Sequence, residues 1–113
     1  MALSRNATLK TTDEFIRISS QVRQALRQTE IVTRRFQRRI ESGSSVTDAI
    51  GVLGDSVHFR ALTELLSELE HARHACRRAL AAQAISEGMS RGELARMWGV
   101  ARQLVARIAK EER

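Results

Sequence analysis

The chain has 113 residues, of which 42% are hydrophobic and 4% aromatic, and it contains no proline. This length accommodates one domain, or one small domain with an oligomerisation element, and the apolar content excludes general disorder. Long helices form easily in such a composition, whereas a β-sandwich or barrel is hard to build from it. We therefore expect an all-α fold.

Positive charge dominates the sequence, with a formal net charge of +6 and arginine supplying 17 of the 19 basic residues. Residues 1–42 carry nine basic and four acidic side chains, residues 43–70 one and five, and residues 71–113 nine and four. Two basic segments thus flank an acidic one. An excess of this kind suits a polyanionic partner, above all nucleic acid.

The single cysteine, Cys76, excludes a disulfide framework within the chain and indicates a reducing, cytoplasmic setting. No apolar run approaches the roughly 20 residues of a membrane span, and the N-terminus lacks the apolar core of a secretory signal. We expect neither a membrane partner nor a cofactor.

The first helix is expected from about Thr11 to Ser42, after a flexible N-terminus at residues 1–10. Thr11 and Glu14 have the spacing of a capping box, and Gly43 is a natural stop. A heptad pattern runs through this helix, and the apolar residues expected in the core or dimer contact are Phe15, Ile18, Val22, Leu26, Val32 and Phe36.

A short connector separates this helix from a second long one. Ser45 is placed to cap a short helix that ends at Gly54. The second helix is then expected to start at Asp55 or Ser56 and to run to about Glu87. Its expected core or dimer residues, again at heptad spacing, are Leu62, Leu65, Leu66, Leu69 and Cys76.

The apolar stripe on both long helices spans heptad positions a, d and e, which is wider than a seam for one neighbour. Two helices alone do not bury such stripes. We therefore expect residues 11–78 to form an antiparallel hairpin that pairs with a second copy into a four-helix dimer core. Residues 79–113 remain for a separate function.

The C-terminal stretch predicts two short helices. Ser90 and Glu93 form another capping box, so a helix is expected from about Arg91 to Trp98. Gly99 permits a left-handed backbone, and a second helix follows from about Ala101.

This stretch resembles the helix-turn-helix unit of bacterial and phage transcriptional regulators. In that unit a small residue precedes the turn glycine by four places, and apolar residues follow the glycine at one, six and nine places. These positions are filled here by Ala95, Gly99, Val100, Val105 and Ile108. The third helix of such a unit is expected from the end of the second long helix, around Leu80, Ala84 and Ile85.

The resemblance implies that residues 79–113 form a helix-turn-helix DNA-binding region, with 101–110 as the recognition helix in the major groove. Arginine and glutamine suit guanine and adenine edges, and Lys110 and Arg113 suit phosphates. The residues expected to contact DNA are Arg91, Arg96, Ala101, Arg102, Gln103, Ala106, Arg107 and Lys110. Such regulators often have serine or threonine at the place of Ala101, which cannot cap the helix.

Other patterns have simpler interpretations. The run from Arg34 to Arg39 is a second candidate for DNA contact, although a solvated or salt-bridged face, for example with Arg34 or Arg35 on Glu64, is favoured. His71, His74 and Cys76 give too few ligands on one face for a metal site. Trp98 is expected to pack, although it is also a candidate for stacking on a base.

No arrangement of catalytic residues stands out, so we do not expect an enzyme. The sequence predicts a homodimeric, sequence-specific double-stranded DNA-binding protein of the nucleoid, acting as a repressor. Two alternatives stay open. One is an architectural nucleoid protein, and the other is an antitoxin-like adaptor whose helical hairpin binds a protein partner.

Overall fold

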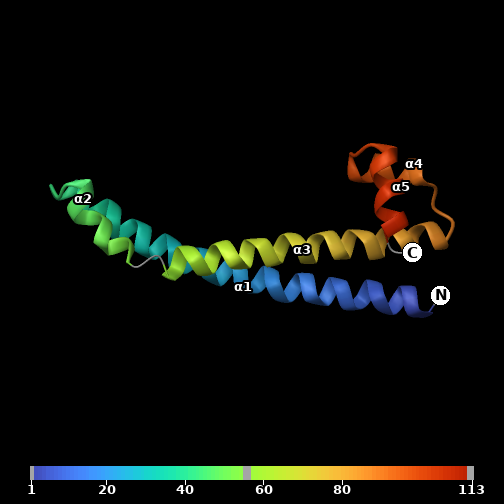
Figure 1. The fold of residues 1–113 in the computed structure, drawn as a ribbon, viewed down its shortest axis with the longest axis horizontal. Coiled ribbons are helices and arrows are strands. Elements are labelled where there is room, and N and C mark those ends of the chain that lie inside the picture. Colours follow the sequence, from blue (N-terminus) through green and yellow to red (C-terminus); the bar gives the residue numbers. More distant parts are fainter. Residues whose placement is uncertain (1, 55–56, 112–113) are drawn as a thin grey trace. The chain divides into compact units, whose positions relative to one another are not determined.

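The computed structural model describes residues 2–54 and 57–111, and within these ranges it is helical without any strand (Figure 1). The all-α prediction is therefore confirmed. The helices in chain order are α1 (Ala2–Glu41), α2 (Val46–Ala49), the 3-10 helix η1 (Ile50–Leu53), α3 (Val57–Ser86), α4 (Arg91–Trp98) and α5 (Arg102–Glu111).

The chain divides into two compact units. One unit combines Met1–Ile16 with Glu70–Arg113, and the other is Arg17–Leu69. Both long helices pass through both units, so each unit contains a stretch of α1 and a stretch of α3. The division into 11–78 and 79–113 stays a prediction.

The predicted start of the first helix near Thr11 is wrong, because α1 already begins at Ala2. The Thr11 hydroxyl does not cap. It donates to the carbonyls of Ala7 at 2.9 Å and Thr8 at 3.0 Å, as threonine does inside a helix. No proline or glycine interrupts residues 2–10, so the helix continues back through them. The flexibility predicted for residues 1–10 concerns motion and stays a prediction.

The connector forms as predicted. The Ser45 hydroxyl accepts the backbone N–H of Asp48 at 3.1 Å and caps α2. Gly54 ends η1 at φ 72°, a left-handed value that glycine adopts without strain. The predicted start of the second long helix at Asp55 or Ser56 lies outside the described residues.

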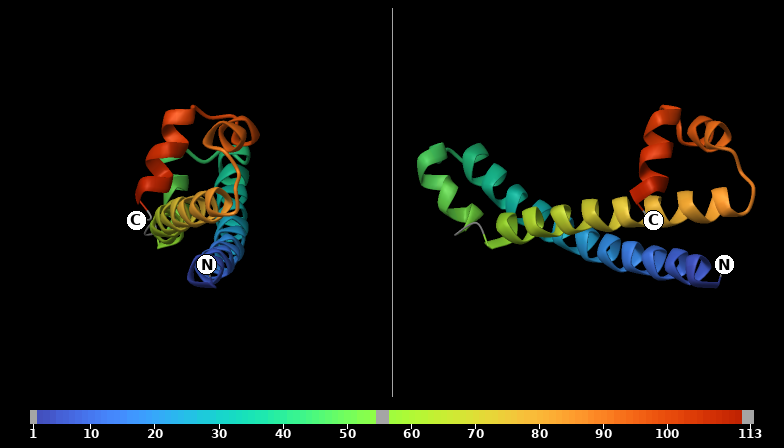
Figure 2. Two further views of the ribbon diagram at one scale, coloured as in Figure 1. Left: turned by 90° about the vertical axis from the view of Figure 1, so that its right-hand side faces the viewer. Right: turned by 45° about the vertical axis from the view of Figure 1, so that its right-hand side comes forward.

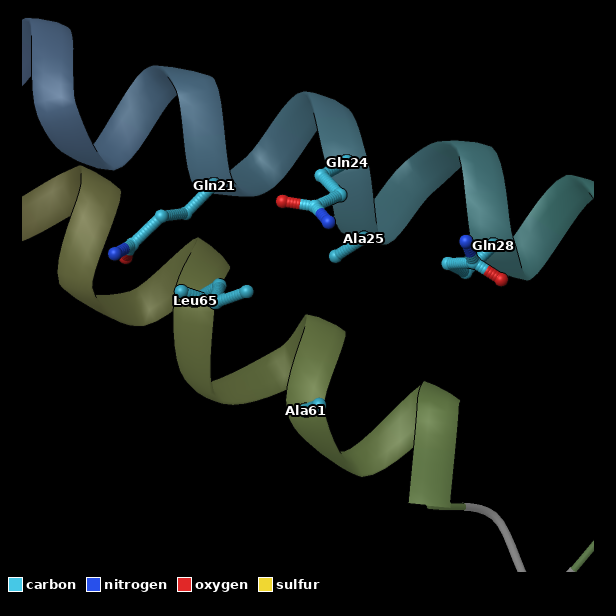
Figure 3. Close-up of a pocket in the computed structure, with 6 residues that line it drawn as sticks. All are labelled: Gln21, Gln24, Ala25, Gln28, Ala61 and Leu65. Atoms are coloured by element: carbon cyan, nitrogen blue, oxygen red, sulfur yellow. The ribbon is translucent and has the colours of Figure 1, made fainter.

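Within Arg17–Leu69, α1 and α3 run antiparallel. Figure 3 shows Gln21 beside Leu65 and, further along α1, Ala25 across from Ala61. The small side chains of Ala25 and Ala61 leave a groove of about 330 Å³ between the two helices. Leucine or a longer residue at either place would fill this space.

The predicted core residues differ in burial. Those at the centre of the stripe are buried: Ile18, Val22, Val32 and Cys76. A second group is half-buried: Phe15, Phe36, Leu62, Leu65 and Leu69. Leu26 and Leu66, at the e positions, are exposed by 42% and 45%. The e edge of the stripe is thus left uncovered within one copy of the chain.

Three helices end in the same way, with a glycine at positive φ and paired backbone hydrogen bonds. At the end of α4, the Val100 N–H donates to the Ala95 carbonyl at 3.0 Å, and the Gly99 N–H donates to the Arg96 carbonyl at 3.3 Å. This pattern is the Schellman motif. It recurs after α1 at Gly43 and after α3 at Gly88.

Replacing Gly99 by alanine should lower the free energy of unfolding by about 1–2 kcal/mol, because a side chain at φ 66° strains the backbone. A Cβ at Gly99 meets nothing within 4 Å, so the loss is conformational rather than steric. Urea unfolding followed by circular dichroism measures it.

Gly92→Ala is the matched control. Gly92 lies within α4, and an added Cβ makes only ordinary contacts there, the nearest being Arg96 Nη1 at 3.7 Å. This variant should be more stable by a few tenths to about 1 kcal/mol, because alanine favours helix. No loss of stability in the Gly99 variant would contradict the left-handed turn.

Candidate nucleic-acid interface

A small apolar core joins α3, α4 and α5, which fold together at the C-terminal part of α3 (Figure 2). Ala81 of α3 is fully buried in it, and Ile85 packs at its edge. The third helix predicted for the helix-turn-helix is therefore supplied by α3, with Ala81 rather than Leu80 at the centre, since Leu80 is 36% exposed. The remaining buried members are Leu94, Ala95, Val105, Ile108 and Ala109.

Ala95 has the role that the spacing assigns to it. It is 5% exposed in the core where α4 crosses its neighbours, and a larger side chain there would push the helices apart. Val100 follows the turn and packs against the same core, and Trp98 does likewise, as predicted.

The N-terminus of α4 is capped as predicted. The Ser90 hydroxyl accepts the backbone N–H of Glu93 at 3.1 Å. Arg91 and Arg96 are both exposed. The Arg96 guanidinium extends back toward the first turn, because its Nη1 atom would lie 3.7 Å from a Cβ at Gly92. The first turn of α4 therefore carries two positive charges beside the positive end of a helix dipole.

The α5 helix has one apolar and one basic face. Its apolar face is closed into the core, where Val105 and Ile108 are 0% and 2% exposed. On the other side Arg102, Gln103, Arg107 and Lys110 are exposed, and Ala106 is half-buried. The spacings of four and three place Gln103, Arg107 and Lys110 in one row along the helix.

A guanidinium and an indole ring fix the end of α4 against α3. The Arg77 guanidinium carbon lies 5.3 Å from the centroid of the Trp98 ring, within the roughly 6 Å of a cation–π contact. Beside it, Arg73 donates to both carboxylate oxygens of Glu70 and holds the pKa of that carboxyl below its ordinary value. The sequence pattern did not predict the Arg77–Trp98 contact, because it joins residues from different helices.

The last turn of α5 is bound to α3 by charge. The Glu111 carboxylate lies 3.2 Å from Nε2 of His74 and 3.7 Å from Nη1 of Arg78. An acidic residue is unfavourable at the C-terminus of a helix, and the contacts with these two partners offset that cost for Glu111. This contact was not predicted. The sequence pattern suggests only a metal-ligand role for His74, because its partner is 37 residues away.

Among residues 2–54 and 57–111, no three His, Cys, Asp or Glu side chains group as a metal site would require. Cys76 is buried, and His71 is exposed. None of the described helices is both long enough and apolar enough to cross a membrane.

The start of α5 is uncapped. Ala101 precedes the helix, and its carbonyl accepts the N–H groups of Leu104 at 3.0 Å and Val105 at 3.3 Å. Alanine has no side-chain oxygen for the free N–H groups of the first turn. We predict that Ala101→Ser raises the free energy of unfolding by about 0.5–2 kcal/mol, measured by urea unfolding.

Ala101→Val is the control for that substitution, because valine adds a side chain but no cap. It should give no gain. Equal stabilisation by serine and valine would show that the effect comes from packing and not from capping.

Comparison with known families agrees with this geometry. A family model described as the CENP-B N-terminal DNA-binding domain matches residues 80–113. The curated proteins and the solved structures compared with the chain gave no match. The matched segment begins at the turn of α3 that carries Ala81 and includes α4 and α5. Residues 80–113 are thus similar to a DNA-binding domain of the helix-turn-helix type, a match that does not extend to regulators of bacteria and phages.

Proposed function

We propose that the chain is a sequence-specific double-stranded DNA-binding protein that acts as a homodimeric transcriptional repressor on nucleoid DNA in the cytoplasm. One observation carries the DNA-binding part. The α5 helix exposes Gln103, Arg107 and Lys110 in one row while its other face is closed into the core. A helix held in this way presents a fixed set of donors to a major groove.

The exposed groups of α5 differ in what they offer DNA. Arg107 has the fork of N–H donors that binds guanine O6 and N7, and Gln103 matches adenine N6 and N7. Lys110 is a flexible point charge for phosphates, as are Arg91 and Arg96 at the start of α4. The small side chain of half-buried Ala106 leaves room for α5 to approach the floor of the DNA major groove. Arg113, also considered for a phosphate contact, lies outside the described residues.

The dimer is supported by the e edge of the apolar stripe. Leu26 and Leu66 are large, apolar and exposed by 42% and 45%, and both lie in the unit Arg17–Leu69. A second copy that covers them would remove this apolar surface from water, which is the usual driving force of association. A dimer that reads two half-sites would space them by about 34 Å, one turn of duplex.

Replacing Arg107 by alanine should weaken binding to the selected DNA site by about 1–3 kcal/mol, because a bidentate base contact is lost. Site selection from a random duplex library gives the site, and fluorescence anisotropy gives the affinity. The matched control is Arg23→Ala, an exposed arginine of α1. Unchanged affinity of the Arg107 variant would remove α5 from the recognition role.

The same selection separates the proposed function from its alternatives. A regulator should prefer its site to random DNA by about 10³-fold or more. Near-equal binding to all sequences would indicate an architectural protein. Binding to DNA only after a protein partner is added would indicate an adaptor.

The dimer has its own test. The double variant Leu26→Glu/Leu66→Glu should sediment as a monomer while keeping its helical circular dichroism, because both residues are exposed within one copy. Ile16→Glu, at a residue 64% exposed in the other unit, is the control and should leave the dimer intact. A dimer of undiminished strength in the double variant would place the contact elsewhere.

A further inference from the structure

A second basic surface lies at the end of α1, in the unit Arg17–Leu69. A groove of about 470 Å³ is formed there between the last turns of α1, the turn that follows, and η1. Its lining is Arg35, Arg38, Arg39, Ser42 and Val52. Three guanidinium groups therefore border one hollow, and its lining contains no carboxylate among the described residues.

These three arginines keep their charge unopposed. Arg34 pairs with Glu30 at 3.9 Å within the helix, and not with Glu64 as predicted. For Arg35, Arg38 and Arg39, the described part of the chain provides no ion pair. Three unpaired positive charges close together repel one another, so a bound anion would stabilise the site.

The backbone under the groove is well defined. The Arg39 carbonyl accepts the N–H of Ser44 and the hydroxyl of Ser42, each at 3.0 Å, in the Schellman turn that closes α1. Arginines also favour a helix C-terminus because its dipole is negative there, which is a structural reason for Arg38 and Arg39. That end carries only about half an elementary charge, however, so three guanidinium groups leave a clear positive excess.

The same face of α1 continues toward the N-terminus with amide side chains. Gln28 precedes Arg35 by seven residues, two helical turns, and Gln24 and Gln21 follow in the same direction along the edge shown in Figure 3. Amide N–H groups also bind phosphate oxygens. From Gln21 to Ser42 this surface extends about 32 Å, nearly one turn of duplex.

We propose that the groove formed by Arg35, Arg38 and Arg39 binds the sugar-phosphate backbone of a DNA duplex, independently of the helix-turn-helix. Guanidinium groups bind phosphate oxygens with two parallel hydrogen bonds, and Val52 offers an apolar wall for deoxyribose. The contact reads no bases. Together with the proposed binding of α5 to DNA, on which this part rests, the groove gives the chain a second DNA contact that a second duplex can occupy.

The test uses the full-length chain and two triple variants of equal charge. Arg35→Gln/Arg38→Gln/Arg39→Gln removes the groove charges, and Arg23→Gln/Arg27→Gln/Arg34→Gln removes three exposed arginines of the same helix outside the groove. Affinity for a random-sequence duplex is measured over a range of salt concentrations. Capture of a labelled second duplex by protein bound to an immobilised one measures bridging.

The groove variant should lose capture of the second duplex by roughly tenfold or more. Its slope of log affinity against log salt should fall by about 2–3, near 0.9 for each lost phosphate contact. The control variant should keep capture within about twofold of the original chain and should leave the slope unchanged. Equal losses in the two variants would mean a general charge effect, and no loss in the groove variant would mean that DNA does not bind there. Either result overturns the proposal.

A third protein keeps this result separate from the proposed function. Replacing all the exposed DNA-facing residues of α4 and α5 by alanine (Arg91, Arg96, Arg102, Gln103, Arg107 and Lys110) disables the helix-turn-helix, and random DNA should then still bind through the groove. Adding the groove substitutions to it should abolish that remaining binding. Remaining binding that resists those substitutions would again contradict the groove. Failure of α5 to select a site would contradict the regulator without affecting the groove.

Discussion

Close packing around Ala81 determines what the basic face of α5 is able to do. Ala81, Ala95 and Ala109 are 0%, 5% and 9% exposed, so small residues from three helices meet in one core. Their size lets the helices approach until Val105 and Ile108 are sealed from water. The orientation of α5 follows from this contact, and with it the direction in which Gln103, Arg107 and Lys110 extend.

Acidic side chains serve local structure and leave the basic faces unopposed. Glu70 binds Arg73, Glu111 binds His74 and Arg78, and Glu30 binds Arg34. Solvent screens the charges of these pairs, so their effect on stability is small. Their effect on charge distribution is larger. The exposed row of α5 and the groove at the end of α1 both keep positive charge that no described carboxylate neutralises, which is the condition for binding a polyanion.

The local signals in the sequence were reliable wherever backbone chemistry alone decides the outcome. Ser45 and Ser90 cap helices, and Gly99 turns the chain, at the predicted places. The predicted start of α1 was wrong because threonine also fits inside a helix, where the Thr11 hydroxyl donates to a backbone carbonyl. The sequence alone does not distinguish a threonine that caps a helix from one inside a helix.

Contacts between distant residues could be predicted only in part. The spacing around Gly99 indicated the core of α4 and α5, because one motif contains both helices. It did not show that Ala81, on the opposite face of α3 from the buried Cys76, completes that core. The Glu111 contact and the arginine groove depend on side chains brought together by turns, and heptad spacing carries no information about them.

The unit that holds the DNA-binding core is built from two segments that lie far apart in the sequence, and this affects the order in which the chain folds. Its first segment, up to Ile16, is made early during synthesis, whereas its second segment begins only at Glu70. The intervening unit, Arg17–Leu69, has all its residues available before then and is free to close first. The early segment must therefore wait for its partner, and closing a loop of this length carries an entropic cost that grows only slowly with length. An early-formed hairpin in Arg17–Leu69 shortens the effective loop and lowers that cost, so the order of synthesis favours contact between the segment up to Ile16 and the segment from Glu70 only after the hairpin has formed.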